Sequence, residues 1–182
     1  MSQSVTLRDV LEADLPVLYE HQAEPEAVRV AVYPSRELDA FMTHWKTKVL
    51  GDASVRKKAV LLDAEVAGYV TGFTRDGERC LGYWFGRDFW GKGIATAAVT
   101  EFVRDHETTR PLFAHTAVSN VGSIRVLEKV GFDFIDDRDQ RGTSCAFLSR
   151  TGFDGDHQAR KDYKVCLHRE STPRSCGSAL FG

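Results

Sequence analysis

A glycine-rich turn is the segment of this sequence best suited to bind an anion. Seven of the fifteen glycines fall between residues 68 and 93, and Gly91 and Gly93 separate a strand-like run from the strongest helical pattern. Glycine lets backbone N–H groups approach a ligand closely, and free N–H groups at a helix N-terminus favour phosphate. The segment contains neither GxxxxGK[ST] nor GxGxxG. On its own it is explained about equally well by a tight turn without a ligand.

Hydrophobic periodicity predicts a mixed α/β domain around this turn. Asp14 and Ser35 are the expected caps of the first two helices. Helices are predicted at Leu15–Gln22, Ser35–Gly51, Gly91–Glu107 and Asn120–Val130. Strands are predicted at Val5–Val10, Lys58–Asp63, Glu65–Thr74, Arg79–Gly86, Leu112–Val118, Phe132–Ile135 and Tyr163–His168.

The remaining segments show no regular pattern. Pro25 and Pro34 bracket a stretch expected to be irregular, and a polar, glycine-containing stretch from Asp136 to Gln158 is expected to separate the last two strands. The length fits one domain over residues 1–170, followed by a mobile tail over residues 171–182.

A second motif follows the glycine turn, one predicted strand later. Residues 120–132 read NVGSIRVLEKVGF, and residues 81–95 read LGYWFGRDFWGKGIA. Together these motifs resemble those of the GNAT superfamily of acyl-CoA-dependent N-acetyltransferases. Their sequences are most similar to the RimJ/RimL-like branch. The resemblance extends in order over nearly the whole chain. It implies an α/β (α+β) fold with a mostly antiparallel central sheet, splayed between the fourth and fifth strands, and helices on both faces.

The resemblance implies acetyl-CoA as co-substrate. Its pantetheine arm would insert between the strand that carries Tyr83 and the strand Leu112–Val118. A backbone N–H near Phe85 would polarise the thioester carbonyl, and Asn120 would hydrogen-bond the cofactor arm. The side chain of Arg87, like that of Lys92, fits a phosphate contact or a solvated charge equally well. The backbone implied to bind the pyrophosphate comprises Trp90, Gly91, Lys92, Gly93, Ile94, Ala95 and Thr96.

The sequence departs from the family pattern at two positions. Asp88 stands where relatives often carry Gln or Arg, and it adds no positive charge. Leu127 stands where many relatives carry a Tyr thought to protonate the leaving thiolate. Ser123, one turn beyond Asn120, is therefore the residue expected to reach the sulfur.

An attacking amine must lose a proton, because an alkyl amine with a pKa of ~10.4 is mostly protonated at neutral pH. Candidates for this step are His115, Glu65 and Tyr83. Each also has a purely structural explanation. His115 fits a partly buried histidine that hydrogen-bonds a carbonyl, Glu65 an exposed charge in a turn, and Tyr83 an aromatic residue of the core. Positioning of the amine can also supply much of the rate without a dedicated base.

Composition excludes several classes of protein. The 182 residues carry 24 Lys and Arg against 26 Asp and Glu, and this balance argues against nucleic acid as a partner. No apolar run reaches the ~18 residues of a membrane span, and the N-terminus lacks a signal-peptide pattern. Four cysteines without CxxC spacing favour reduced thiols and no metal site. These features predict a cytoplasmic protein, monomeric or homodimeric.

Residues 1–50 are the acidic part of the chain, with five Lys and Arg against eight Asp and Glu. Relatives build part of the acceptor groove from this region. An acidic rim would favour a cationic amine such as a protein N-terminus, a polyamine or an aminoglycoside, whereas a solvated helix face explains the same charges.

The expected function is therefore transfer of an acetyl group from acetyl-CoA to a primary amine by direct attack in a ternary complex. A non-catalytic acyl-CoA-binding or sensing module of the same fold is the alternative. A phosphate- or nucleotide-binding domain of another family has only the glycine turn in its favour.

Overall fold

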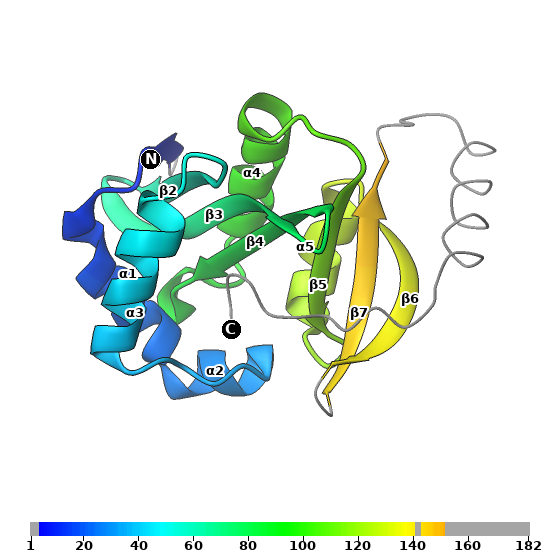
Figure 1. Cartoon of the computed structure of the whole chain (residues 1–182), viewed down its shortest axis with the longest axis horizontal. Coiled ribbons are helices and arrows are strands. Elements are labelled where there is room, and N and C mark those ends of the chain that lie inside the picture. The colour runs from blue at the N-terminus through cyan, green and yellow to red at the C-terminus, as the bar shows by residue number, and fades with distance from the viewer. Residues whose placement is uncertain (1–3, 141–142, 152–182) are drawn as a thin grey trace.

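The computed structural model describes residues 4–140 and 143–151, which are built around a seven-stranded sheet in the order β1-β2-β3-β4-β5-β7-β6 (Figure 1). Every neighbouring pair is antiparallel except β4 and β5, which are parallel. The strands are β1 (Val5–Arg8), β2 (Arg56–Leu62), β3 (Glu65–Arg75), β4 (Glu78–Phe85), β5 (Leu112–Ala117), β6 (Asp133–Gln140) and β7 (Thr143–Arg150).

Strands β4 and β5 pair at one end only. Their register contains Cys80 opposite Phe113 and Leu81 opposite Ala114, and the ladder stops there although β4 continues to Phe85. Figure 1 shows the two strands meeting at one end and diverging towards the other. The predicted splay between the fourth and fifth strands is confirmed.

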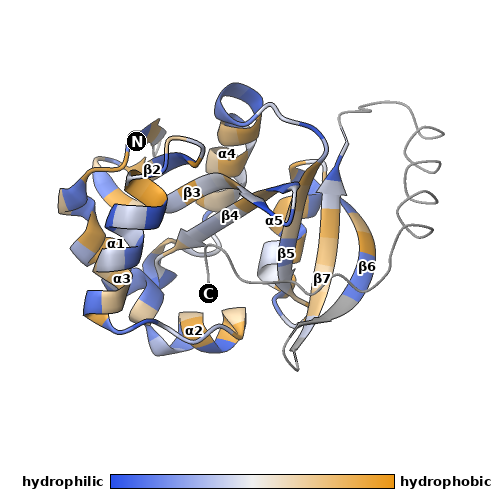
Figure 2. Cartoon of the chain, in the orientation of Figure 1, coloured by the Kyte–Doolittle hydropathy of each residue, from blue (hydrophilic) through white to orange (hydrophobic). Residues whose placement is uncertain are grey.

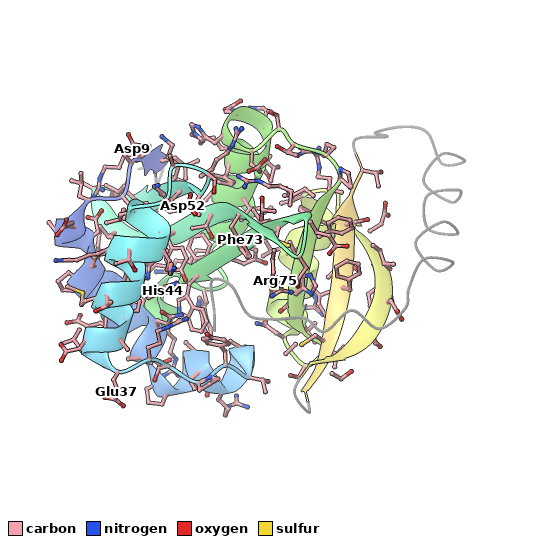
Figure 3. The ribbon with its side chains drawn as sticks, in the orientation of Figure 1. Asp9, Glu37, His44, Asp52, Phe73 and Arg75 are labelled. Carbon is pink, nitrogen blue, oxygen red and sulfur yellow. The ribbon has the colours of Figure 1, made fainter. Side chains whose placement is uncertain are left out.

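Helices cover both faces of the sheet, as predicted. The buried residues form one cluster with α1, α2 and α3 and a second with α4 and α5. In Figure 2 the central residues of β7 and much of α4 are apolar, whereas α1 and α3 alternate between apolar and polar residues. In Figure 3 Phe73 lies inside the molecule, and Asp9 and Glu37 project from its edge. The helices are α1 (Leu15–Ala23), α2 (Pro25–Ala31), α3 (Leu38–His44), α4 (Ile94–Glu101) and α5 (Val121–Lys129).

Helix α2 corrects the prediction of an irregular stretch after Pro25. Proline is tolerated at the first position of a helix because its missing N–H would have no partner there. The Glu24 carboxylate caps α2 by accepting a hydrogen bond from the Ala27 N–H at 2.7 Å. Glutamate is not a common N-cap residue, so the start of α2 lacks a clear signal.

The caps of the neighbouring helices also differ from the prediction. Asp14 precedes α1, but its carboxylate accepts hydrogen bonds from the Arg8 guanidinium and the Leu11 N–H instead of capping α1. Helix α3 begins after Glu37 rather than at Ser35, and it continues as a π-helical turn (Trp45–Leu50) to Gly51.

The last described strand lies earlier in the chain than predicted. Strand β6 extends well beyond Ile135, and β7 falls inside the stretch that was expected to be irregular. The apolar run from Cys145 to Leu148 explains β7, since this strand is covered on both sides by β5 and β6. The predicted strand Tyr163–His168 and the predicted tail lie outside the described residues.

A buried ion-pair cluster joins the end of the α4 segment to the sheet. Helix α4 continues as a π-helical turn (Phe102–His106), and the fully buried Glu107 follows. Arg79 on β4 donates to the Glu107 carboxylate from Nε at 2.8 Å and from Nη2 at 2.5 Å, and the Thr109 N–H donates at 3.2 Å. Gly72 on β3 leaves room for this carboxylate, because a Cβ there would overlap it.

Desolvation acts to raise the pKa of Glu107, but the hydrogen bonds from Arg79 and Thr109 outweigh it and hold the pKa below its ordinary value. A lowered pKa in the folded state means that this carboxylate stabilises the fold above its ordinary pKa of 4.5. That contribution disappears as the pH falls through the folded-state value.

Replacing Glu107 with Gln should therefore lower the free energy of unfolding by about 3 kcal/mol at neutral pH, because Arg79 would be left without its buried partner. Urea unfolding at a series of pH values would measure the loss, and the variant should also depend less on pH below 4.5. Asp105→Asn removes an exposed ion pair with Arg104 and should leave stability nearly unchanged. Equal effects of the two substitutions would contradict the assignment.

No helix in the described ranges is both long and apolar enough to cross a membrane.

Candidate functional site

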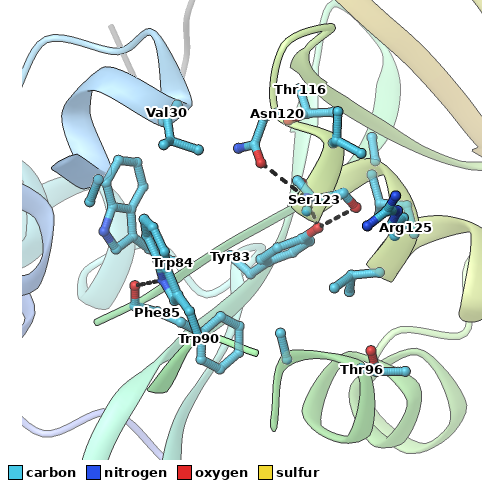
Figure 4. A pocket seen from close by; sticks show the side chains of 18 of the residues that line it. Val30, Tyr83, Trp84, Phe85, Trp90, Thr96, Thr116, Asn120, Ser123 and Arg125 are labelled. Carbon is cyan, nitrogen blue, oxygen red and sulfur yellow. Dashed lines mark hydrogen bonds between the residues drawn. The ribbon is translucent and has the colours of Figure 1, made fainter. Parts of the chain in front are cut away.

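A cavity of 590 Å³ lies where β4 and β5 separate, and it is lined by α2, β4, the glycine turn, α4, β5 and α5 (Figure 4). This cavity brings together most of the predicted site residues. Those that line it are Tyr83, Phe85, Trp90, Gly91, Gly93, Ile94, Ala95, Thr96, His115, Asn120 and Ser123.

Three residues considered from the sequence are not among the lining residues. Lys92 is exposed between the two glycines of the turn, and Glu65 is exposed at the start of β3. The exposed Arg87 lies 3.6 Å from the Glu24 carboxylate, measured from Nη1 to Oε1. None of these three residues therefore forms part of the cavity wall.

The glycine turn has the backbone conformation that only glycine adopts easily. Gly91 has φ of 72° and Gly93 has φ of 77°, both in the left-handed region. A Cβ on either residue would meet no atom within 4 Å, so both face open space. Because a positive φ cannot continue a helix, α4 begins at Ile94 rather than at the predicted Gly91. The first N–H groups of α4 lack intrahelical partners and are available to an anion.

The end of β4 directs backbone groups into the gap. The Gly86 N–H donates to the Ala67 carbonyl of the β3 side at 3.0 Å. Alternate residues of a strand face alternate neighbours, so the N–H groups of Tyr83 and Phe85 face β5, beyond the point where the ladder stops. The Phe85 carbonyl faces the same gap and accepts a hydrogen bond from Trp90 Nε1 at 2.9 Å.

Tyr83 and Ser123 meet across the cavity, from β4 and α5 (Figure 4). Their hydroxyl oxygens lie 2.7 Å apart, and Tyr83 Oη lies 3.2 Å from the Ser123 carbonyl. Burial raises the pKa of Tyr83 above its ordinary value, although the Ser123 hydrogen bond opposes this. Tyr83 is therefore a neutral hydroxyl at physiological pH. Asn120 is the N-cap of α5: its Oδ1 accepts a hydrogen bond from the Ser123 N–H at 3.0 Å, which holds Ser123 in place.

The family's tyrosine position and the candidate base His115 differ in their surroundings. Leu127 is 1% exposed in the core and has no ionisable group, so the family's tyrosine position offers no acid in this chain. His115 lines the cavity from β5, and its ring lies 4.6 Å from that of Phe147.

The cavity passes from one face of the sheet to the other. Tyr83 packs with the α4 and α5 cluster, whereas its neighbour Trp84 belongs to the cluster on the α1–α3 face. Trp84 is held there by a hydrogen bond from its Nε1 to the His21 carbonyl, at 2.8 Å. Figure 4 shows Val30 and Trp84 on one side of Tyr83, and Thr96 and Arg125 on the other.

Sequence reasoning missed two groups of lining residues. Arg125 and Lys129 line the cavity from α5, and their spacing of four residues on a predicted helix was the available signal. The wall formed by α2 had no signal, because the helix itself was not predicted. The lining residues of α2 are Ala27, Val30 and Ala31, and Tyr33 lines the cavity just after the helix ends.

Within the described part of the chain, no cluster of three His, Cys, Asp or Glu is arranged to hold a metal ion. The site offers instead backbone N–H groups, the paired hydroxyls of Tyr83 and Ser123, the imidazole of His115, and the cationic side chains of Arg125 and Lys129.

Comparison with known proteins identifies the family to which this fold belongs. Residues 4–133 match the family described as "Acetyltransferase (GNAT) domain". A comparison with curated protein sequences gives no match.

Solved structures with the same fold include acetyltransferases for three kinds of acceptor. The aminoglycoside acetyltransferase AAC(6')-Ib with coenzyme A is 23% identical, with a TM-score of 0.68 over 82% of this chain and 95% of that one. RimL, a ribosomal L7/L12 alpha-N-protein acetyltransferase, also with coenzyme A, is 19% identical, with a TM-score of 0.66 over 82% and 95%. A chimera of the spermidine N-acetyltransferase SpeG from Vibrio cholerae is 15% identical, with a TM-score of 0.66 over 81% and 95%.

Because these solved structures are less than 25% identical to this chain, they establish its fold alone. The family match covers more than two thirds of the chain. The splayed sheet, the glycine turn and the sequence match agree: this chain belongs to the GNAT acetyltransferase family.

Proposed function

We propose that this protein transfers an acetyl group from acetyl-CoA to a primary amine, by direct attack of the amine on the thioester. The observation that carries the proposal is the single cavity that joins the glycine turn, the Tyr83–Ser123 pair and the opposite face of the sheet. Both substrates can therefore meet in the gap between β4 and β5.

Acetyl-CoA fits the α4 and α5 side of this cavity. The pyrophosphate would lie against the N–H groups that follow Gly93, where the positive end of α4 favours an anion. Arg125 and Lys129 line the same cavity and would add positive charge. The pantetheine arm would hydrogen-bond to the backbone of Tyr83 and Phe85 where it faces the gap. The Phe85 N–H would polarise the thioester carbonyl.

In the reaction the amine nitrogen forms a bond to the acetyl carbonyl carbon and the carbon–sulfur bond breaks. The nitrogen loses one proton and the CoA thiolate gains one. Ser123 would donate a proton to the thiolate and recover one through the Tyr83 hydroxyl, which would in turn take a proton from solvent and so end the cycle neutral. We assign His115, on β5, to accept the proton of the amine, because it lines the cavity on the side opposite Ser123. The proton taken from the amine would pass to solvent, so the two transfers balance.

The pyrophosphate assignment predicts that Gly93→Val abolishes acetyl-CoA binding. Thermal unfolding with acetyl-CoA at 100 times its Kd should show a stability gain of about 2.7 kcal/mol for the natural chain and none for the variant. Gly77→Val is the matched control, because Gly77 also has a positive φ of 82° and open space around a Cβ, but lies in the β3–β4 turn. It should be strained to a similar degree and still bind. Binding by Gly93→Val would contradict the assignment.

The proton-transfer assignment predicts that Ser123→Ala and Tyr83→Phe each lower kcat by about 100-fold, with little change in acetyl-CoA affinity. The double variant should lose little more than either single variant, because the two hydroxyls act as one unit. Thiol release from acetyl-CoA measures turnover. Tyr19→Phe, which alters a tyrosine packed on Phe41 away from the cavity, is the control.

Equal losses of turnover and affinity would instead assign the two hydroxyls to cofactor binding. Stabilisation by acetyl-CoA without thiol release to any amine would contradict transfer and support an acyl-CoA-binding module.

A further inference from the structure

We call the part of the cavity on the α1–α3 face the acceptor pocket. Helix α2 forms one wall, and Trp84 and the β5 strand form the others. Trp84 cannot turn away easily because its indole is bonded to the His21 carbonyl. The acceptor pocket is defined by Ala27, Val30, Ala31, Tyr33, Trp84 and His115.

This pocket is apolar, and no Asp or Glu is found among the described residues that line the whole cavity. The charged residues that line the cavity are instead Arg125 and Lys129 of α5. Figure 4 shows Arg125 beyond Tyr83 from Trp84 and Val30. Aliphatic and aromatic side chains therefore provide most of the surface that an acceptor would contact near His115.

Of the eight acidic residues in the first fifty positions, Asp9 pairs with Lys58 at 2.7 Å, and Glu37 and Asp39 are exposed and do not line the cavity. Four more form ion pairs of their own. The ion pairs join Glu12 to Lys46 at 3.1 Å, Asp14 to Arg8 at 2.6 Å, Glu24 to Arg87 at 3.6 Å and Glu26 to Arg29 at 2.6 Å. Glu20 is exposed on α1 and does not line the cavity. The acidic surplus of this region therefore does not form the wall of the acceptor pocket.

These surroundings select against a polycation. An ammonium group in an apolar site without a carboxylate is destabilised, so its pKa falls and the neutral amine is favoured. For an amine with a single charge, the lowered pKa produces the neutral form that attacks the thioester. A polyamine or aminoglycoside would bring further charges without a partner in the pocket, near two cationic side chains.

We propose, on the basis of the proposed function, that the acceptor is a primary amine with no other positive charge, attached to an aromatic or branched aliphatic group. Trp84, Val30 and Ala27 would pack against that group, and His115 would face the amine. Two kinds of molecule share this chemistry: a small arylalkylamine, and a peptide N-terminus with an apolar first residue.

The test compares kcat/KM for four acceptors by thiol release at saturating acetyl-CoA. The acceptors are 2-phenylethylamine, an amidated tripeptide beginning with phenylalanine, spermidine and kanamycin. At least one of the first two should exceed both polycations by about 10-fold or more. The ratio between the first two distinguishes a small amine from a peptide.

Equal or faster transfer to spermidine or kanamycin would overturn the acceptor proposal and leave the proposed function standing. No thiol release with any of the four, while acetyl-CoA still stabilises the protein, would contradict transfer itself and the acceptor proposal with it.

A charge placed in the pocket provides a second test. Val30→Asp should lower kcat/KM for the preferred apolar amine by about 10-fold and raise it for spermidine, because the new carboxylate pairs with a cation. Val17→Asp is the matched control, since Val17 is exposed on α1 outside the cavity and should change neither value. A uniform loss for all acceptors with Val30→Asp would contradict a role of this wall in selecting the acceptor.

Discussion

The end of the β4–β5 ladder after Leu81 is the constraint on which the rest of the site depends. A sheet that loses its pairing exposes backbone N–H and C=O groups, and buried groups of this kind need partners. Trp90 provides one by donating its indole N–H to the Phe85 carbonyl. The groups that remain along β4 form a row suited to an extended ligand, which is why we propose that the pantetheine arm binds there.

The same separation opens the sheet from face to face. Because side chains alternate along β4, Tyr83 turns towards α5 and Trp84 towards α1. One strand thus contributes a hydroxyl to the cofactor side and an indole to the acceptor side. The charge distribution is uneven: Arg125 and Lys129 line the cavity from α5, whereas no acidic residue of the first fifty positions lines it. The near-neutral net charge of the whole chain therefore says little about either substrate.

The sequence predicted the parts of the site that depend on local backbone chemistry. The glycine turn between β4 and α4 and the helix at residues 121–129 are local features with recognisable signals. The parts that depend on packing were less accessible. The contact between Tyr83 and Ser123 joins residues 40 positions apart, and only the fold brings them together.

Two elements were missed for identifiable physical reasons. Helix α2 has a glutamate cap and only 7 residues, so its signal was weaker than that of the flanking prolines. Strand β7 has a short apolar run inside a polar segment, and its position in the interior of the sheet was not apparent from local patterns. Both omissions affected the acceptor side of the molecule, where the sequence had suggested an acidic rim that the cavity lining does not contain.

Amide hydrogen exchange along β4, measured by NMR with and without saturating acetyl-CoA, tests the central claim most directly. If the gap between β4 and β5 holds the pantetheine arm, exchange at Tyr83 and Phe85 should slow markedly. Exchange at Trp84 and Gly86, whose N–H groups face β3, should change little. Unchanged exchange at Tyr83 and Phe85, under conditions where acetyl-CoA is bound, would contradict the account.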